Sequence, residues 1–402
     1  MQGRPNTTDD MVQGQAAYVA MLYLNDSYSE NVLQTRLNVI GVQNPYIGKG
    51  GIVGAIKDLA KMRSPRLLIV DISGVDDPLE RVHELAALCD PQVGVIVVGE
   101  TNDVVLYRSL KNAGVSEYFF KPIVGDVVGH TCNALLNGAV EQTSPGIGIG
   151  KLVLLLGTRG GAGVTTIATQ LSLYLANERK RRTVLVDLDL EAGDVALQLG
   201  VEPQRALGEV LAHPERIDDL FLERGVTHIS DRLDLLASLE PLDDAAHYEE
   251  DAVLSLLTNL VRTYRYVFVD LPVHSAIHLP RLMRQPGTCF LISDCTLTAA
   301  RDVARWRTAL GANSVNRTTF HILNKKGADF ALPFDEFLHA VGTPPDVVIS
   351  YKHEVGRASV LGATEVVKCR SFMQELGPAL QIISGEGVHA PKRGFLRGIL
   401  GG

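Results

Sequence analysis

The residues of this chain with the clearest chemical potential lie in the segment from Leu152 to Thr166, LVLLLGTRGGAGVTT. An apolar run there stops in a glycine-rich turn, and the turn leads into a segment compatible with a helix. Glycines let successive backbone N–H groups face one concavity at the positive end of the helix, which suits a phosphate group. The candidate nucleotide-binding residues are Gly160, Gly161, Ala162, Gly163, Val164, Thr165 and Thr166.

Two positions of this loop depart from the usual phosphate-binding pattern. That pattern places a lysine before its Ser or Thr, where the lysine reaches the β- and γ-phosphates and the hydroxyl ligates Mg²⁺. Here Val164 stands at the lysine position and Thr158 replaces the first glycine, whereas Thr165 remains as a candidate Mg²⁺ ligand. Because the motif lacks two of its residues, the rest of the chain must decide whether it binds phosphate.

Two later segments place carboxylates where such a loop would need them. We expect Thr183 to Leu190, TVLVDLDL, to form a strand ending in Asp187 and Asp189, and Tyr266 to Pro272, YVFVDLP, to form another ending in Asp270. In a parallel sheet these carboxylates gather at the carboxyl edge, where ligands of such folds bind. Together they can hold Mg²⁺, its waters and an attacking water. Each aspartate alone would be interpreted as a strand-end or helix-cap residue.

At these residues the chain resembles the MinD/ParA class of P-loop ATPases, and within it the CpaE/TadZ pilus-assembly branch. That class has a deviant loop, KGGxGK[ST]T, whose first lysine reaches the partner's ATP across a nucleotide-sandwich dimer. The sequence RGGAGVTT puts Arg159 at that lysine, so the resemblance implies that its guanidinium acts in trans. It also implies that Asp187 supports Mg²⁺, Asp189 positions the attacking water, Asp270 is the Walker B aspartate and Asn324 contacts adenine.

The change at Val164 has a definable energetic meaning. Losing one charge-assisted contact costs about 1.5–3 kcal/mol, which is about a ten- to hundredfold weakening of binding. Binding survives such a loss, but phosphoryl transfer depends on positive charge placed where the transition state develops negative charge. The sequence therefore predicts ATP binding with slow or absent ATPase activity.

Length and composition agree with a large soluble protein whose hydrophobic residues can fill two cores. The chain has 402 residues, of which 46% are hydrophobic, enough for two domains. No apolar run reaches the roughly 18 residues that span a bilayer, and the polar start carries no signal-peptide core. Five cysteines without ligand spacing are expected to be reduced core thiols of a cytoplasmic protein.

Charge argues against nucleic acid as a partner. The net charge is −8 with a pI near 5.8, whereas nonspecific DNA binding draws on clustered Lys and Arg. The dense basic run Arg179–Arg182 falls at an expected turn, where solvated charges are ordinary. A chromosome-partitioning role is therefore disfavoured.

The expected organisation is two doubly wound α/β domains. We expect a first domain over 16–137, a Gly-rich linker over 138–150, a MinD/ParA-like P-loop domain over 151–385 and a tail over 386–402. In the first domain, strands are expected at 18–24, 67–70, 93–98 and 118–120, with helices around 52–62, 79–88 and 103–113. This alternation favours a parallel sheet with helices on both faces.

The first domain resembles a response-regulator receiver (flavodoxin-like) domain. Asp71, which ends RLLIVD, occupies the phosphoacceptor position, and Lys121-Pro122 matches the family's lysine-proline pair. The acidic pair is reduced to Asn25-Asp26, and Gly99 stands where the family has a hydroxyl, with Thr101 two residues on. These departures favour an interaction module over a phosphorylation switch, and a capping or core-edge role for Asp71.

The second half continues the alternation. We expect helices at 251–264, 299–310 and 372–383 and strands at 289–293, 319–323 and 347–350, with Asn324 following a strand. The tail Pro391 to Gly402 carries apolar residues at helical spacing beside basic ones. This pattern invites a peripheral membrane contact, although its glycines favour a disordered end or a partner-docking peptide.

The resemblance implies a nucleotide-dependent factor that localises or assembles a Tad (Flp) pilus machine. It implies ATP and Mg²⁺ as cofactors, a homodimer, a pilus secretion ATPase and polar landmark proteins as partners, and recruitment from the cytoplasm to the cell pole or inner membrane. The alternatives are an active MinD/ParA-like ATPase that positions another cargo, a nucleotide-free scaffold and a phosphorelay regulator.

Overall fold

The computed structural model describes residues 18–137, 150–214, 225–241, 248–314 and 316–384. The chain divides into two compact units, Met1–Ile149 and Gly150–Gly402, and each unit is described by itself. The expected tail and all of the expected linker except Gly150 lie outside the described residues.

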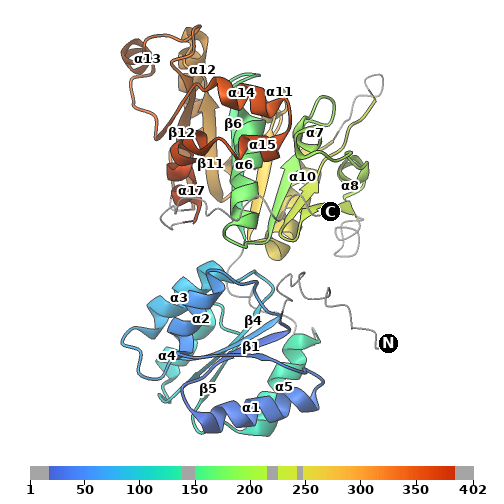
Figure 1. The fold of residues 1–402 in the computed structure, drawn as a ribbon, viewed down its shortest axis with the longest axis vertical. Helices are drawn as coiled ribbons and strands as arrows, with labels where there is room; N and C mark the ends of the chain where they lie inside the picture. The colour runs from blue at the N-terminus through green and yellow to red at the C-terminus, as the bar shows by residue number, and fades with distance from the viewer. Residues whose placement is uncertain (1–17, 138–149, 215–224, 242–247, 315, 385–402) are drawn as a thin grey trace, which may run out of the picture. The chain divides into compact units, whose positions relative to one another are not determined.

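The first unit contains a five-stranded parallel sheet (Figure 1). Its strand order is 2-1-3-4-5, the order of flavodoxin-like doubly wound domains. In spatial order the strands are β2 (Tyr46–Gly48), β1 (Ala20–Tyr23), β3 (Leu67–Asp71), β4 (Gly94–Gly99) and β5 (Glu117–Phe120).

Helices cover both faces of this sheet because its central strands are apolar on both sides. On β3, Leu68 and Val70 face one core and Leu67 and Ile69 face the other, as the alternation of a strand requires. The first core is closed by α2 (Gly51–Leu59), α3 (Pro78–Leu88) and α4 (Val104–Asn112). The second is closed by α1 (Ser27–Val39) and α5 (Gly125–Leu136).

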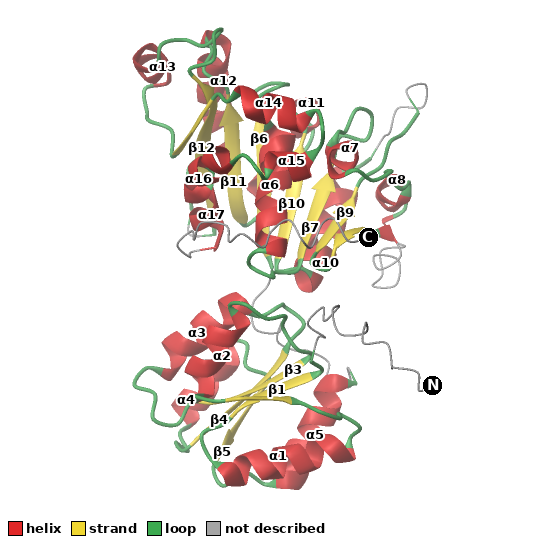
Figure 2. Cartoon of the chain, viewed as in Figure 1, coloured by secondary structure: helices red, strands yellow, loops and turns green. Residues whose placement is uncertain are grey.

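The second unit contains an eight-stranded sheet that is parallel except for one edge strand, β8, which runs antiparallel to β9. In spatial order the strands are β13 (Val347–Ser350), β12 (Arg317–Lys326), β11 (Gly287–Ser293), β6 (Lys151–Gly157), β10 (Tyr266–Leu271), β7 (Thr183–Asp187), β9 (Leu233–Leu236) and β8 (Thr227–Ser230). Figure 2 shows helices on both sides of this sheet.

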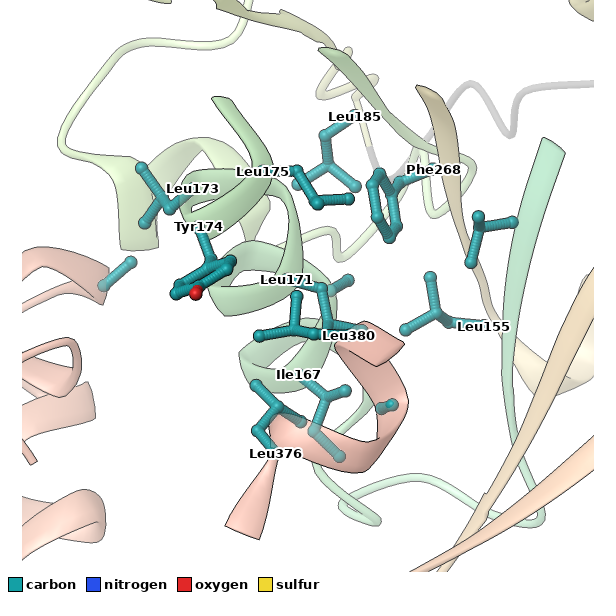
Figure 3. Packing of buried hydrophobic residues seen from close by; sticks show 14 of the residues in the cluster. Leu155, Ile167, Leu171, Leu173, Tyr174, Leu175, Leu185, Phe268, Leu376 and Leu380 are labelled. Atoms are coloured by element: carbon teal, nitrogen blue, oxygen red, sulfur yellow. The ribbon is translucent and has the colours of Figure 1, made fainter. Parts of the chain in front are cut away.

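One face of the second sheet is covered by the buried helix α6 and the C-terminal helices. These are α6 (Val164–Asn177), α7 (Val195–Leu199), α14 (His353–Ser359), α15 (Ala363–Val366), α16 (Arg370–Glu375) and α17 (Gly377–Ser384). Figure 3 shows Leu171 and Leu175 of α6 between the sheet residues Leu155 and Phe268 and the helix residue Leu380. This packing fixes α6, and with it the loop that precedes α6.

The other face of the sheet is covered by elements that pack around an amphipathic helix, α10. They are α8 (Ala206–Ala212), α10 (Glu250–Thr263), α11 (Val273–Ala276), η2 (Leu282–Arg284) and α12 (Leu297–Leu310). Helix α13 (Phe334–Val341) packs beside α12 at the β13 edge.

Several sequence-based expectations were wrong in detail. The strand expected over 183–190 ends at Asp187, so Asp189 lies in the turn after it. Strand β12 continues to Lys326, which places Asn324 inside the strand. The helix expected over 372–383 is two helices that meet at Leu376. The basic run Arg179–Arg182 is only partly solvated, since Arg181 is buried.

Two further features concern membrane-spanning helices and cysteine thiols. Within the described part of the chain, no helix combines the length and apolar character needed to cross a membrane. All five cysteines are buried and unpaired in disulfides, which agrees with the expected core thiols.

Candidate functional site

The candidate nucleotide loop connects β6 to α6 at the carboxyl edge of the sheet. The backbone has φ of 78° at Gly161 and 96° at Gly163, values that side chains other than glycine adopt rarely. Atoms added at Gly160 and Gly161 would meet nothing within 4 Å. The loop therefore has the curled backbone and the open face that phosphate needs at a helix N-terminus.

The loop and the strand-end carboxylates line one cavity of about 380 Å³. The sequence-predicted residues on its wall are Arg159, Gly160, Gly161, Gly163, Val164, Thr165, Thr166, Asp187, Asp189 and Asp270. Others on the wall are Gly157, Ala192, Gly193, Asp194, Gln198, Leu271, Pro272, Val273, His274 and Lys325. Segments more than 100 residues apart in the sequence thus converge on a single concavity.

Two of the carboxylates are deeply buried and directly adjacent. Asp187 and Asp270 are paired in register on neighbouring strands and are 2% and 6% exposed. Burial raises the pKa of each, and the neighbouring Asp270 adds to the rise at Asp187. A hydrogen bond from Thr165 works against the rise at Asp270. Burial of two adjacent carboxyl groups disfavours their charged form, and a cation bound between them would offset this cost.

The turn after β7 holds the third carboxylate. Asp187 accepts hydrogen bonds from the backbone N–H groups of Asp189, at 3.1 Å, and Val195, at 3.3 Å. Asp189 accepts one from Ala192 at 3.0 Å. A Cβ atom at Gly193 would lie 2.4 Å from Oδ2 of Asp187, so the turn closes this tightly only because residue 193 is glycine.

These residues fit Mg²⁺ and a nucleotide phosphate. Among the residues that the structure describes, no three His, Cys, Asp or Glu side chains form a complete metal cage. Mg²⁺ usually takes one or two carboxylates and completes its shell with waters and substrate phosphates. Asp187, Asp270 and the Thr165 hydroxyl, beside an open glycine loop, match that requirement.

The two positions that differ most from the class pattern have structural roles. Val164 packs against the apolar cluster around α6, so its side chain adds no charge to the cavity. Arg159 lines the cavity, and its Nη1 donates to Oγ1 of Thr298 at 2.5 Å, in the first turn of α12. A trans role for Arg159 would require this contact to open.

Asn324 contacts the loop backbone. Its Nδ2 donates to the Ala162 carbonyl at 2.8 Å, and a Cβ at Gly163 would lie 2.4 Å from the same nitrogen. Asn324 is not on the wall of the cavity, and its contact with adenine stays a prediction. The neighbouring Lys325 was missed by sequence reasoning, although its Nζ donates to the Gly161 carbonyl at 2.7 Å.

The first unit holds its own polar cluster, in which Asp71 is fully buried. Oδ2 of Asp71 accepts from Nζ of Lys121 at 2.6 Å and from the Asn25 N–H at 3.0 Å, and Oδ1 accepts from the Ser73 N–H at 2.8 Å. Lys121 also pairs with Asp26 at 2.8 Å. Although burial acts to raise it, these donors hold the pKa of Asp71 below its usual value.

Tyr118 of β5 fills the space beside Gly99. The Tyr118 hydroxyl donates to the Thr101 carbonyl at 2.6 Å. A Cβ at Gly99 would lie 2.7 Å from that hydroxyl oxygen. The missing side chain at residue 99 and the inward position of Tyr118 are therefore complementary.

Comparison with known proteins identifies the fold of the second unit. A ParA family ATPase from Chlorobium tepidum TLS matches 57% of this chain and 96% of its own, with a TM-score of 0.50 and 21% identity, and this similarity covers the second unit. The second unit has the MinD/ParA fold. Conversely, no protein-family model matches the chain.

Other matches of the MinD/ParA-like chain are partial. The antiactivator FleN of Pseudomonas aeruginosa is 33% identical over 72 residues, 18% of this chain. The chain spans between a quarter and a half of the curated relatives that it matches. A pilus assembly protein CpaE from Caulobacter crescentus CB15 is 27% identical, over 30% of this chain and 94% of its own, with a TM-score of 0.28.

Proposed function

We propose that this protein binds ATP with Mg²⁺ in the cavity at the loop before α6 and serves as a nucleotide-dependent assembly or localisation factor. The observation that carries the proposal is the cavity of about 380 Å³ lined by the loop and by Asp187, Asp189, Asp194 and Asp270. A fold that brings a phosphate nest and metal-binding carboxylates together provides both halves of a nucleotide site.

Each part of the site has a defined task in this proposal. Backbone N–H groups from Gly160 to Thr166 bind phosphate oxygens. Thr165, Asp187 and Asp270 hold Mg²⁺, which neutralises phosphate charge when bound. Asp189 is more exposed than Asp187 and Asp270, and it orients an attacking water.

Hydrolysis is proposed to be slow or absent. Val164 is partly buried against the apolar cluster around α6 and supplies no charge to the developing transition state. Arg159 is held by Thr298 and would contribute only after moving to a second copy. The output of the site is then a nucleotide-bound homodimer, with turnover as a slow reset.

The setting proposed for this dimer is a Tad (Flp) pilus machine at the cytoplasmic face of the membrane. The support is the pairing of a receiver-like unit with a MinD/ParA unit in one chain, the combination that the CpaE/TadZ resemblance implies. The proposed partners are the pilus secretion ATPase and a polar landmark protein, with the receiver-like unit as docking surface.

Calorimetry and light scattering with ATP and Mg²⁺ would test the core of the proposal. Wild type is expected to bind and to double in mass, whereas Arg159→Ala is expected to bind and remain a monomer. Arg301→Ala is a matched control, because Arg301 is an exposed arginine of the same region that pairs with Asp302. Absence of binding by wild type would reject the nucleotide site.

A nucleotide-free scaffold is the second candidate, and the apolar side chain of the partly buried Val164 at the lysine position favours it. A scaffold predicts no change in mass or melting temperature with nucleotide. The same titration therefore separates the two functions, since only the first requires a saturable response to ATP.

A further inference from the structure

The cavity described above has too little positive charge for the ligand proposed for it. Four acidic side chains line it, those of Asp187, Asp189, Asp194 and Asp270. Residue 164 is an apolar valine. A nucleoside triphosphate would therefore bind next to these four carboxylates without the lysine that usually lies in the loop. A cation from elsewhere in the fold is needed to balance the phosphates.

The lysine and arginine side chains on the described wall of the cavity are those of Arg159 and Lys325. The Arg159 guanidinium is engaged by Thr298 of α12. The Lys325 ammonium lies on the loop itself, 2.7 Å from the Gly161 carbonyl oxygen. An ammonium has three donors, and this contact uses one of them.

The backbone at Lys325 is shaped to bring its side chain to the loop. Lys325 has a φ of 58°, an uncommon conformation for a residue with a side chain. The pairing of β12 with β13 shifts register between Leu323 and Lys326, and Oδ1 of Asn324 accepts from the Lys325 N–H at 2.9 Å. The irregularity turns residue 325 toward the loop, while Lys326 lies over the Phe334 ring, with its Nζ 3.9 Å from the centroid.

We propose that Lys325 is a phosphate-binding residue of this site, supplying in cis, from strand β12, the positive charge that Val164 does not supply. The ligand class is a nucleoside di- or triphosphate with Mg²⁺, so the inference rests on the proposed function. Asn324 and Lys325 together hold the carbonyls of Ala162 and Gly161, which places the ammonium at the loop before nucleotide arrives.

The test is calorimetric titration of the full chain with Mg·ATP and Mg·ADP. Lys325→Met is expected to weaken binding about ten- to hundredfold, the loss for one charge-assisted contact. Lys325→Arg is expected to keep most of the affinity, because it keeps the charge. The matched control is Lys326→Met, which removes the adjacent lysine and is expected to bind as wild type does.

Thermal melting without nucleotide distinguishes a structural role of Lys325 from a role in phosphate binding. We expect Lys325→Met and wild type to have the same melting temperature in the absence of ligand. A large loss of melting temperature in Lys325→Met, with no recovery of affinity in Lys325→Arg, would overturn it. Equal affinity in wild type and Lys325→Met would overturn this inference alone, whereas no binding by wild type would overturn the proposed function with it.

Discussion

A buried histidine gives the second unit a stability that should depend on pH. His321 lies on β12, is 2% exposed, and has Nε2 2.8 Å from Oγ of Ser293. Burial, with a smaller contribution from the positive charge of Arg307, lowers the pKa of His321 to about 3. The folded protein thus keeps this imidazole neutral at pH values where the unfolded chain protonates it.

The sign and size of the effect follow from proton linkage. The unfolded imidazole has a pKa of about 6.5, so between pH 6.5 and pH 3 the unfolded state binds the extra proton and stability falls as pH falls. At pH 5, which is about 1.5 pH units below the pKa of the unfolded imidazole, the free energy of unfolding is lower by about 2 kcal/mol. Above pH 7 the contribution is fully present.

The chain provides its own reporter for this measurement. Its single tryptophan, Trp306, is buried in α12 of the same unit, so urea unfolding followed by tryptophan fluorescence reports that unit. His321→Gln removes the titrating group, and we expect it to lose about 2 kcal/mol less stability than wild type between pH 7 and pH 5. His339→Gln removes an exposed histidine and should behave as wild type. Parallel losses in wild type and His321→Gln would refute the reasoning.

Three further predictions concern the two polar sites. Gly193→Ala places a Cβ 2.4 Å from a metal-site carboxylate oxygen and should weaken Mg·ADP binding at least tenfold by calorimetry, whereas Gly356→Ala, with nothing within 4 Å, should not. Val164→Lys should tighten Mg·ATP binding about tenfold or more; unchanged affinity in the same titration would contradict the assignment of the loop. Asp71→Ala removes one of the two carboxylates that pair with Lys121 and the acceptor of the Asn25 and Ser73 N–H groups, and should destabilise the first unit by about 3 kcal/mol, measured by hydrogen exchange of β3. Asp126→Ala, which breaks an exposed ion pair, should cost less than about 1 kcal/mol, and equal protection of β3 in both variants would count against the buried pair.

Long apolar runs allowed the central sheet of each unit to be predicted. The strands that carry Asp187 and Asp270 were expected from the short apolar runs before each aspartate, and they are the buried strands β7 and β10. The short or polar elements were missed. Strand β2 has three residues, and β8 has the sequence THIS, so neither shows the alternation that sequence reasoning uses.

The identities of most site residues could be predicted from the sequence, but the contacts between them could not. Glycines and strand-end aspartates carry a local signal, and the cavity contains them. Lys325 carries no such signal, because its position depends on a positive φ and a register shift between β12 and β13. The helix expected over 372–383 is a different case, because Gly377-Pro378 is a local breaker signal that divides an apolar periodic segment into α16 and α17.

The fit of Tyr118 beside Gly99 has a consequence for how the first unit communicates. A signalling domain transmits a chemical event when one of its side chains can exchange between two stable positions. The Tyr118 ring is 7% exposed, its hydroxyl is bonded to the Thr101 carbonyl, and no side chain at residue 99 competes for the space. The inward position of Tyr118 is thus set by the Thr101 carbonyl and by the absence of a side chain at residue 99. Under the proposed function, a partner that docks on the surface around α4 and β5 would meet the same face in each copy of the protein, and nucleotide binding in the second unit would supply the control.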